Sequence, residues 1–202
     1  MTAYAPARPG DVADFVREQV LGLMVSGVGG DHAVTPLPLL PTVDEAGAVT
    51  EFFGHFARSN SQIETLKADP RALILYQGPH AYIPPAWVSK PGWAPTWNYA
   101  LAQFEVEVRF LPEENHRSIV ELVEALEGGA WSVQQMGERY ERMLPHILAF
   151  RARVTRQTAK FKLGQDESDQ SFGEILSALG DAPVAALMRR ARLELHPPPT
   201  GP

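Results

Sequence analysis

The sequence predicts a mainly β, α+β fold: a small antiparallel barrel of six strands with peripheral helices. The expected strands follow one another without regularly interleaved helices, which argues against a doubly wound parallel sheet. Gln103 to Leu111 alternates apolar and polar residues, as an antiparallel strand with one buried face does. No internal repeat is visible, so a repeat architecture is not expected.

The other five strands are expected over apolar or β-branched runs. These runs are Val20 to Ser26, Ala33 to Leu40, Val49 to Phe56, Ala72 to Tyr76 and Ile147 to Phe161. Pro36 and Pro38 lie inside the second run. Because proline cannot donate to a strand ladder, that run is expected at an edge or a bulge.

Helices are predicted where apolar residues recur every three or four positions. They are expected over Asp11 to Gln19, Ser61 to Ala68, Ser118 to Leu126, Glu138 to Leu144, Phe172 to Leu179 and Pro183 to Leu195. The third is the clearest, because Gly128 and Gly129 follow its end. One domain is expected over residues 1–195, with 196–202 as a flexible tail.

Composition limits the classes of function. The chain has 202 residues, of which 45% are hydrophobic and 21% charged, as is usual for a protein with a packed core. A net charge of −6 disfavours unaided contact with nucleic acid or an anionic membrane.

Cysteine is absent, which excludes disulfides, thiolate metal sites and a cysteine nucleophile. The first residues do not form a secretory leader, and no apolar run approaches the roughly 20 residues that cross a bilayer. A cytoplasmic protein is therefore expected.

The common cofactor and catalytic motifs are absent. The segment Gly27 to Gly30 does not open a helix, so neither a dinucleotide-binding fold nor a phosphate-binding P-loop is predicted. The six histidines are dispersed without ligand spacing, so no metal site is predicted.

Polar donors gather where a predicted strand gives way to a predicted helix. These residues are His55, Arg58, Asn60 and Gln62. Guanidinium and amide donors beside a helix start favour an anion such as phosphate. The alternative is a polar strand exit in which Asn60 or Ser61 caps the helix.

The stretch from Gly78 to Tyr99 combines five aromatic residues with five prolines. So many prolines predict a stiff loop rather than a helix or a central strand. The aromatic side chains are equally compatible with the wall of a planar-ligand pocket and with a loop packed over one mouth of the barrel.

A run of cations follows residue 150, and no acidic residue interrupts it before Asp166. Its members are Arg151, Arg153, Arg156, Lys160 and Lys162. On an extended chain Lys160 and Lys162 share a face and could hold a phosphate or a flavin carbonyl. The alternative is a solvated strand face.

Three blocks of the sequence resemble one family. They are GHFARSNSQ at 54–62, QGPHAYI at 77–83 with SK at 89–90 and PTWNY at 95–99, and ERML at 141–144 with KFKLGQ at 160–165. In this order they resemble the PaiB-like FMN-binding proteins. The chain departs from the family pattern at Pro84, at Gly92-Trp93, and at Gly164 and Asp166.

The resemblance implies an FMN-binding split barrel, usually a homodimer with flavin sites at the subunit interface. Family members are described as negative transcriptional regulators, which implies DNA or a regulatory protein as a further partner. A flavin-dependent oxidoreductase on the same fold is the alternative, and whether the protein is an enzyme stays open. The implied FMN-binding residues are His55, Arg58, Asn60, Gln62, Lys90, Thr96, Trp97, Asn98, Lys160, Lys162 and Gln165.

Overall fold

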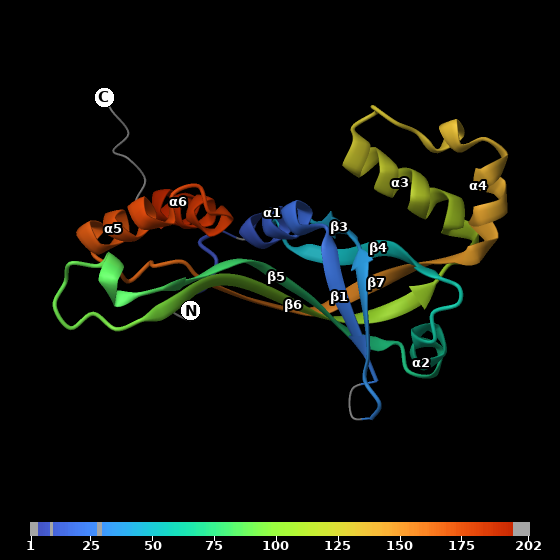
Figure 1. Ribbon diagram of the computed structural model, residues 1–202. Helices are drawn as coiled ribbons and strands as arrows, with labels where there is room; N and C mark the ends of the chain where they lie inside the picture. The colour runs from blue at the N-terminus through green and yellow to red at the C-terminus, as the bar shows by residue number, and fades with distance from the viewer. Residues whose placement is uncertain (1–3, 9, 28–29, 196–202) are drawn as a thin grey trace.

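The computed structural model describes residues 4–8, 10–27 and 30–195 and contains one antiparallel sheet (Figure 1). Its strands are β1 (Leu21–Ser26), β2 (Ala33–Pro38), β3 (Leu40–Val43), β4 (Val49–Ala57), β5 (Arg71–Ile83), β6 (Thr96–Phe110) and β7 (Ile147–Lys162). The sheet has seven strands, so the prediction of six is wrong by one. The extra strand arises because the predicted strand 33–40 breaks at Leu39, between β2 and β3.

The strand order shows that the sheet curls into a barrel. The order is β2-β1-β5-β6-β7-β4-β3, so β2 and β3 lie at its two ends. Only Leu39 separates these strands in the chain, and therefore the two ends of the sheet must meet. Leu39 is 1% exposed, and its N–H donates to Val20 O at 3.0 Å. The barrel thus closes around this residue.

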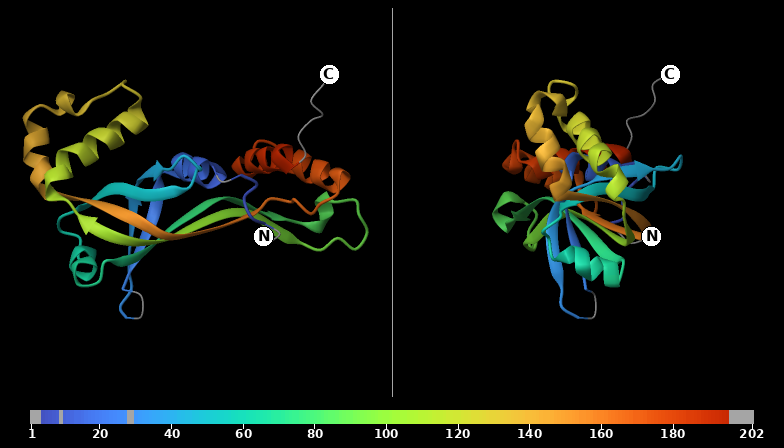
Figure 2. Two further views of the ribbon diagram at one scale, coloured as in Figure 1. Left: turned by 180° about the vertical axis from the view of Figure 1, so that it is seen from behind. Right: turned by 90° about the vertical axis from the view of Figure 1, so that its right-hand side faces the viewer.

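Three strands extend well beyond the barrel (Figures 1 and 2). β5 continues to Ile83 and β6 already begins at Thr96, so the predicted loop 78–99 shrinks to residues 84–95. The register of β5 against β6 shifts between Gln77 and His80. This bulge spans Pro79, which explains how a proline fits inside a strand.

The two faces of the extended strands differ. Helices α1 (Gly10–Gln19), α5 (Asp169–Leu179) and α6 (Pro183–Leu195) lie on one face, while the opposite face is bare (Figure 1). Phe15 of α1 is fully buried there, and a Cβ at Gly78 would lie 2.3 Å from its ring. Glycine at position 78 therefore allows α1 to approach β5. We call the bare side the outer face.

A helical arm stands at the barrel end (Figure 2). It consists of α3 (Asn115–Glu127), the short turn Val133–Met136 and α4 (Glu138–Met143), and it joins β6 to β7. α3 ends at Gly128, whose left-handed φ of 54° suits glycine. The smaller helix α2 (Gln62–Ala68) follows β4. All six predicted helices are therefore confirmed, with small changes at their ends.

Within the described ranges, no helix is both long and apolar enough to pass through a membrane. The predicted tail, 196–202, lies outside the described residues.

Candidate functional site

The predicted donors after β4 lie at the barrel end, and we call His55, Arg58 and Asn60 the barrel-end group. His55 lies on β4 beneath α3, where its Nδ1 is 3.3 Å from Ser118 Oγ. Burial lowers the pKa of His55, so the imidazole is held neutral. A neutral imidazole can donate one hydrogen bond but adds no positive charge for an anion.

Arg58 supplies the charge of the barrel-end group. Its backbone N–H donates to His146 O at 2.8 Å, and its Nε donates to Pro145 O at 3.0 Å. Arg58 is exposed, and its two terminal nitrogens have no acceptor within the described part of the chain. A guanidinium held by Nε with its terminal nitrogens in solvent can bind a phosphate through both of them.

Asn60 and Gln62 have structural contacts. Asn60 Oδ1 accepts from Gln62 N at 2.9 Å, as the capping alternative predicted, and its Nδ2 donates to Thr35 Oγ1 at 2.9 Å. Gln62 is 1% exposed, and its Nε2 lies 3.0–3.1 Å from Met24 O, Ser26 Oγ and Ala33 O. Gln62 Oε1 accepts from Thr35 Oγ1. The Gln62 amide is therefore occupied within the fold, where it ties α2 to β1 and β2.

A second set of predicted residues lies on the outer face of the extension. Trp97 is 52% exposed, and its ring centroid is 5.8 Å from that of Tyr82 and 5.9 Å from that of His80. Lys160 Nζ lies 5.8 Å from the Tyr99 ring centroid. We call Trp97, Tyr99 and Lys160 the outer-face group, because strand register places all three on that face.

The remaining predicted residues lie around the end of β6. Asn98 is 2% exposed and faces α6, where its Nδ2 donates to Met188 Sδ at 3.4 Å, so it points away from Trp97. Lys162 Nζ donates to Thr96 Oγ1. Gln165 folds back to accept from Leu163 N at 2.7 Å.

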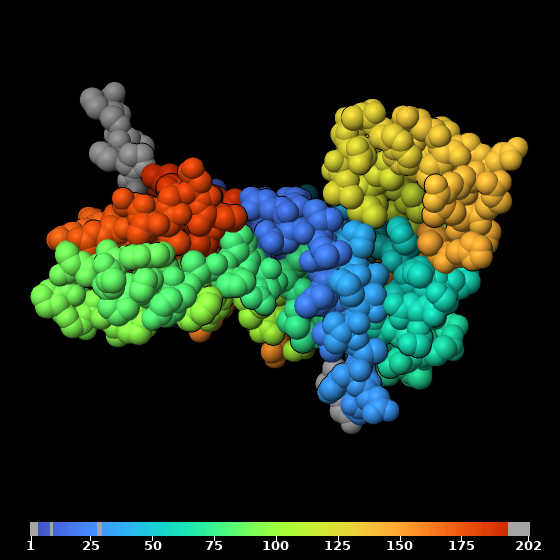
Figure 3. All heavy atoms as spheres, viewed as in Figure 1, coloured from blue at the N-terminus to red at the C-terminus, as the bar shows by residue number. Residues whose placement is uncertain are grey.

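Lys90 lies on the exposed loop 84–95. Ser89 fixes this loop to α5, since its N–H donates to Glu174 Oε2 at 2.8 Å. Figure 3 shows α5 (red) lying directly on this loop (green).

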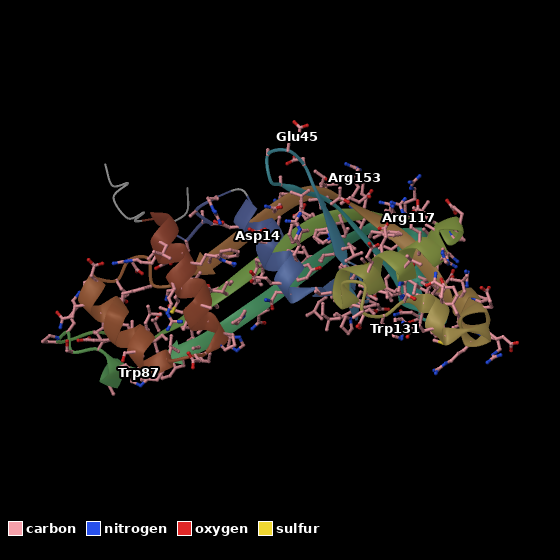
Figure 4. The ribbon with its side chains drawn as sticks, turned by 90° about the horizontal axis from the view of Figure 1, so that it is seen from above. Asp14, Glu45, Trp87, Arg117, Trp131 and Arg153 are labelled. Carbon is pink, nitrogen blue, oxygen red and sulfur yellow. The ribbon has the colours of Figure 1, made fainter. Side chains whose placement is uncertain are left out.

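The barrel-end and outer-face groups are far apart in one chain. His55 pairs with Ala149 near the start of β7, while Lys160 lies near its end. At about 3.3 Å per residue, this length of strand spans roughly 35 Å. Figure 4 shows the same separation, with Trp87 of the extension at one end and Trp131 of the arm at the other. A single chain therefore does not bring the predicted residues into one site.

The curled seven-stranded sheet defines an antiparallel barrel protein, and cationic and aromatic side chains lie at the barrel end and on the extension. The family described as "Putative FMN-binding domain" matches residues 1–156. The chain belongs to this FMN-binding family, which confirms the predicted family and, with it, FMN as the cofactor.

Relatives agree with this assignment. The chain is 28% identical over 176 residues to the "Protease synthase and sporulation protein PAI 2" of Bacillus subtilis, covering 84% of this chain and 83% of the relative. The FAD and heme binding protein of Mycobacterium smegmatis superposes with a TM-score of 0.57 at 13% identity, over 85% of this chain and 78% of that one. The flavocytochrome Anf3 of Azotobacter vinelandii superposes with a TM-score of 0.54 at 11% identity, over 77% of this chain and 76% of that one. These structures confirm the predicted split-barrel fold.

Sequence reasoning grouped Tyr82 and Tyr99 with Trp97 among the aromatic residues of 78–99, but it did not include either tyrosine among the residues expected to bind FMN. It treated 78–99 as a loop, so it did not apply the period-two rule that puts Trp97 and Tyr99 on one face. It also missed Tyr4, whose ring centroid lies 5.6 Å from Lys160 Nζ, because 156 positions separate the two residues. No local signal identifies that contact.

Proposed function

We propose that the protein is a homodimeric, FMN-binding regulator of the PaiB type, in which each FMN lies between the barrel end of one chain and the outer face of the other. The separation of the two groups carries this proposal. Arg58 and Lys160 suit the same ligand, yet roughly 35 Å of strand lies between them in one chain. A second copy can bring both groups to one cofactor.

The outer face has the apolar surface that a dimer needs. Leu21, Leu23 and Val34 are 57%, 40% and 57% exposed, and register places them on the same face as Trp97. Large apolar side chains that gather on one exposed face mark an interaction surface. Burying them against a second copy removes this surface from water and places Trp97 at the interface.

The donor set fits the chemistry of FMN. The terminal nitrogens of Arg58 suit the phosphate, with Asn60 and His55 beside it. Trp97 and Tyr99 offer ring faces to a planar cofactor, and Lys160 offers a cation for a carbonyl or the phosphate. FMN itself supplies redox chemistry when it is bound. The involvement of Gln62, Lys90, Thr96, Asn98, Lys162 and Gln165 remains a prediction.

The regulatory role is supported by the Bacillus subtilis relative, whose name places it in protease synthesis and sporulation. The net charge of −6 favours action through a partner protein over unaided DNA binding. An oxidoreductase on the same fold is the competing function.

Complementation between two variants tests the shared site. We expect Arg58→Ala and Lys160→Ala each to lose FMN binding by at least tenfold, since each removes a cation from both sites of the homodimer. In a dimer that combines one chain of each variant, one of the two sites regains both cations. Flavin absorbance after unfolding and refolding the mixed chains measures this recovery.

The control is a dimer that combines wild type with a chain carrying both substitutions. That dimer contains no site with both cations if the site is shared, and one complete site if each chain binds FMN alone. Because the second mixture also contains wild-type homodimers that bind FMN, each mixed dimer is first purified away from its homodimers. Recovery in the first mixed dimer but not in the second then supports the shared site. The opposite pattern contradicts it.

Visible spectroscopy with NAD(P)H separates the regulator from the oxidoreductase. A bound flavin that the nicotinamides leave oxidised supports the regulator. Rapid bleaching of the flavin band under anaerobic conditions would instead favour the oxidoreductase.

A further inference from the structure

A cleft of about 290 Å³ lies at the far end of the extension, and its lining includes no residue of the barrel-end group or of the outer-face group. We call it the distal cleft. It is lined by Trp93, Ala94, Pro95, Thr96, Asn98, Lys162, Gly164, Asp166 and Glu167. Two of the family departures, Gly92-Trp93 and Gly164 with Asp166, meet in this cleft or beside it. The residues that make this chain differ from its family thus gather around one cavity.

Opposite charges line the distal cleft without pairing. Lys162 Nζ donates to Thr96 Oγ1, and its ammonium lies 5.9 Å from the Tyr4 ring centroid. Asp166 Oδ2 accepts from Tyr4 Oη at 3.1 Å. Among the described residues, neither Asp166 nor Glu167 forms an ion pair with Lys162. An ammonium and two carboxylates therefore face one cavity and leave space between them.

The Glu167 carboxylate, like that of Asp166, is oriented by a neighbouring side chain. Trp93 Nε1 donates to Glu167 Oε1 and Oε2, each at 3.1 Å, which holds that carboxylate beside the indole. Arg192, which contacts this region, donates instead to Glu167 O at 3.1 Å and to Asp169. The Glu167 carboxylate therefore forms no ion pair with the described residues, and a cationic ligand group can bind it.

A buried amide completes the polar lining. Asn98 is 2% exposed, and its Nδ2 donates to Met188 Sδ, a weak acceptor. Its Oδ1 accepts no hydrogen bond from the described residues. The oxygen is not enclosed away from solvent, so a donor in the cleft can replace water there.

We propose that the distal cleft binds a free α-amino acid with an apolar side chain. Lys162 and Thr96 bind the carboxylate, and Asp166, Glu167 and Asn98 Oδ1 bind the ammonium. Trp93, Ala94 and Pro95 contact the side chain. The volume of about 290 Å³ lies just below the usual range for ligand pockets, which suits a ligand as small as an amino acid.

The charges in the distal cleft favour an amino acid over the flavin phosphate. The cleft carries one cation and two carboxylates, and therefore repels a dianion. The proposed FMN residues Arg58, Trp97 and Lys160 are absent from its lining. Thr96, Asn98 and Lys162, which the family resemblance also implies for FMN, do line the cleft, so FMN affinity is measured beside amino-acid affinity in the variants below.

Calorimetric titration with three matched probes tests the proposal. L-leucine carries both charges, L-leucinamide lacks the carboxylate, and N-acetyl-L-leucine lacks the ammonium. We expect L-leucine to bind at least tenfold more tightly than either derivative, since each derivative leaves one side of the cleft without its partner. Equal affinities for the three probes, or no binding of L-leucine, would overturn the proposal.

Two charge-removing variants assign the charges. Lys162→Gln is expected to weaken the binding of L-leucine by about tenfold and to leave the weak binding of L-leucinamide unchanged. Glu167→Gln is expected to weaken both L-leucine and L-leucinamide. If Lys162→Gln instead lowers FMN affinity and leaves L-leucine unaffected, the cleft belongs to the flavin site and the proposal fails. Thermal unfolding of each variant distinguishes loss of the ligand site from loss of the fold.

Discussion

The two parts of β7 carry the same kind of charge in different surroundings. In the part of β7 up to residue 156, Arg151 binds Glu51 at 2.6 Å and Glu114 at 2.8 Å, Arg153 binds Glu107 at 2.5 Å, and Arg156 binds Glu105 at 3.2 Å. In the part after residue 156, neither Lys160 nor Lys162 has a carboxylate partner among the described residues.

The neighbouring strands cause this difference. Residues 151–156 lie beside the acidic part of β6, where Glu107 and Glu105 are the register partners of Arg153 and Arg156. Glu51 of β4 and Glu114, just after β6, reach Arg151. The part after residue 156 has lost β4 as a neighbour and faces Tyr99 and Leu101 of β6. Cations with carboxylate partners stabilise the sheet, whereas those without them are available to a ligand. Five cations that form one run in the sequence therefore divide into two roles.

The largest effect is expected at Arg151. Its side chain is only 17% exposed, and its guanidinium lies 4.3 Å from the Phe53 ring centroid. Arg151→Ala leaves Glu51 without its cation and Glu114 with only the longer contact to Arg117 at 3.9 Å, so we expect the free energy of unfolding to fall by about 3 kcal/mol. Urea denaturation measures the change. A loss below about 1 kcal/mol would show that the Arg151 ion pairs stabilise the fold no more than exposed salt bridges do.

A smaller loss of stability is expected at acidic pH. The hydrogen bond from Arg151 lowers the pKa of Glu114 in the folded state. Its stabilisation is therefore complete above the ordinary glutamate pKa of about 4.3 and is lost as the pH falls through the lower folded value. Wild type should lose more stability than Glu114→Gln between pH 5 and pH 3. Parallel curves for the two proteins would contradict this coupling.

The smallest effect is expected at Arg156. Arg156 and Glu105 are 67% and 52% exposed, so water screens their interaction. Arg156→Gln should change the free energy of unfolding by less than about 0.5 kcal/mol. Lys160→Gln, the matched change in the part after residue 156, should also leave stability unchanged while it weakens FMN binding. If Lys160→Gln lowered the free energy of unfolding as much as Arg151→Ala does, the cations in the two parts of β7 would not differ in role.

The sequence by itself determined the secondary structure and the family. Alternation over 103–111, helical spacing before Gly128 and the block 54–62 are local patterns, and local patterns are set by residues close together in the chain. Prediction failed at Leu39 and over 78–99. Over 78–99 the prolines indicated a loop, but the bulge at Pro79 allows a strand. Over 33–40 the prolines correctly indicated an edge strand, but they did not indicate its break at Leu39.

The tertiary structure alone decided which predicted site residues are available to a ligand. Gln62 is held by β1 and β2, and Asn98 faces α6, although the sequence placed both beside polar or aromatic neighbours. Pairing partners such as Arg151 and Glu51 lie 100 positions apart. Such contacts depend on strand register and on closure of the barrel, which no local pattern encodes. The same long-range geometry separates Arg58 from Lys160.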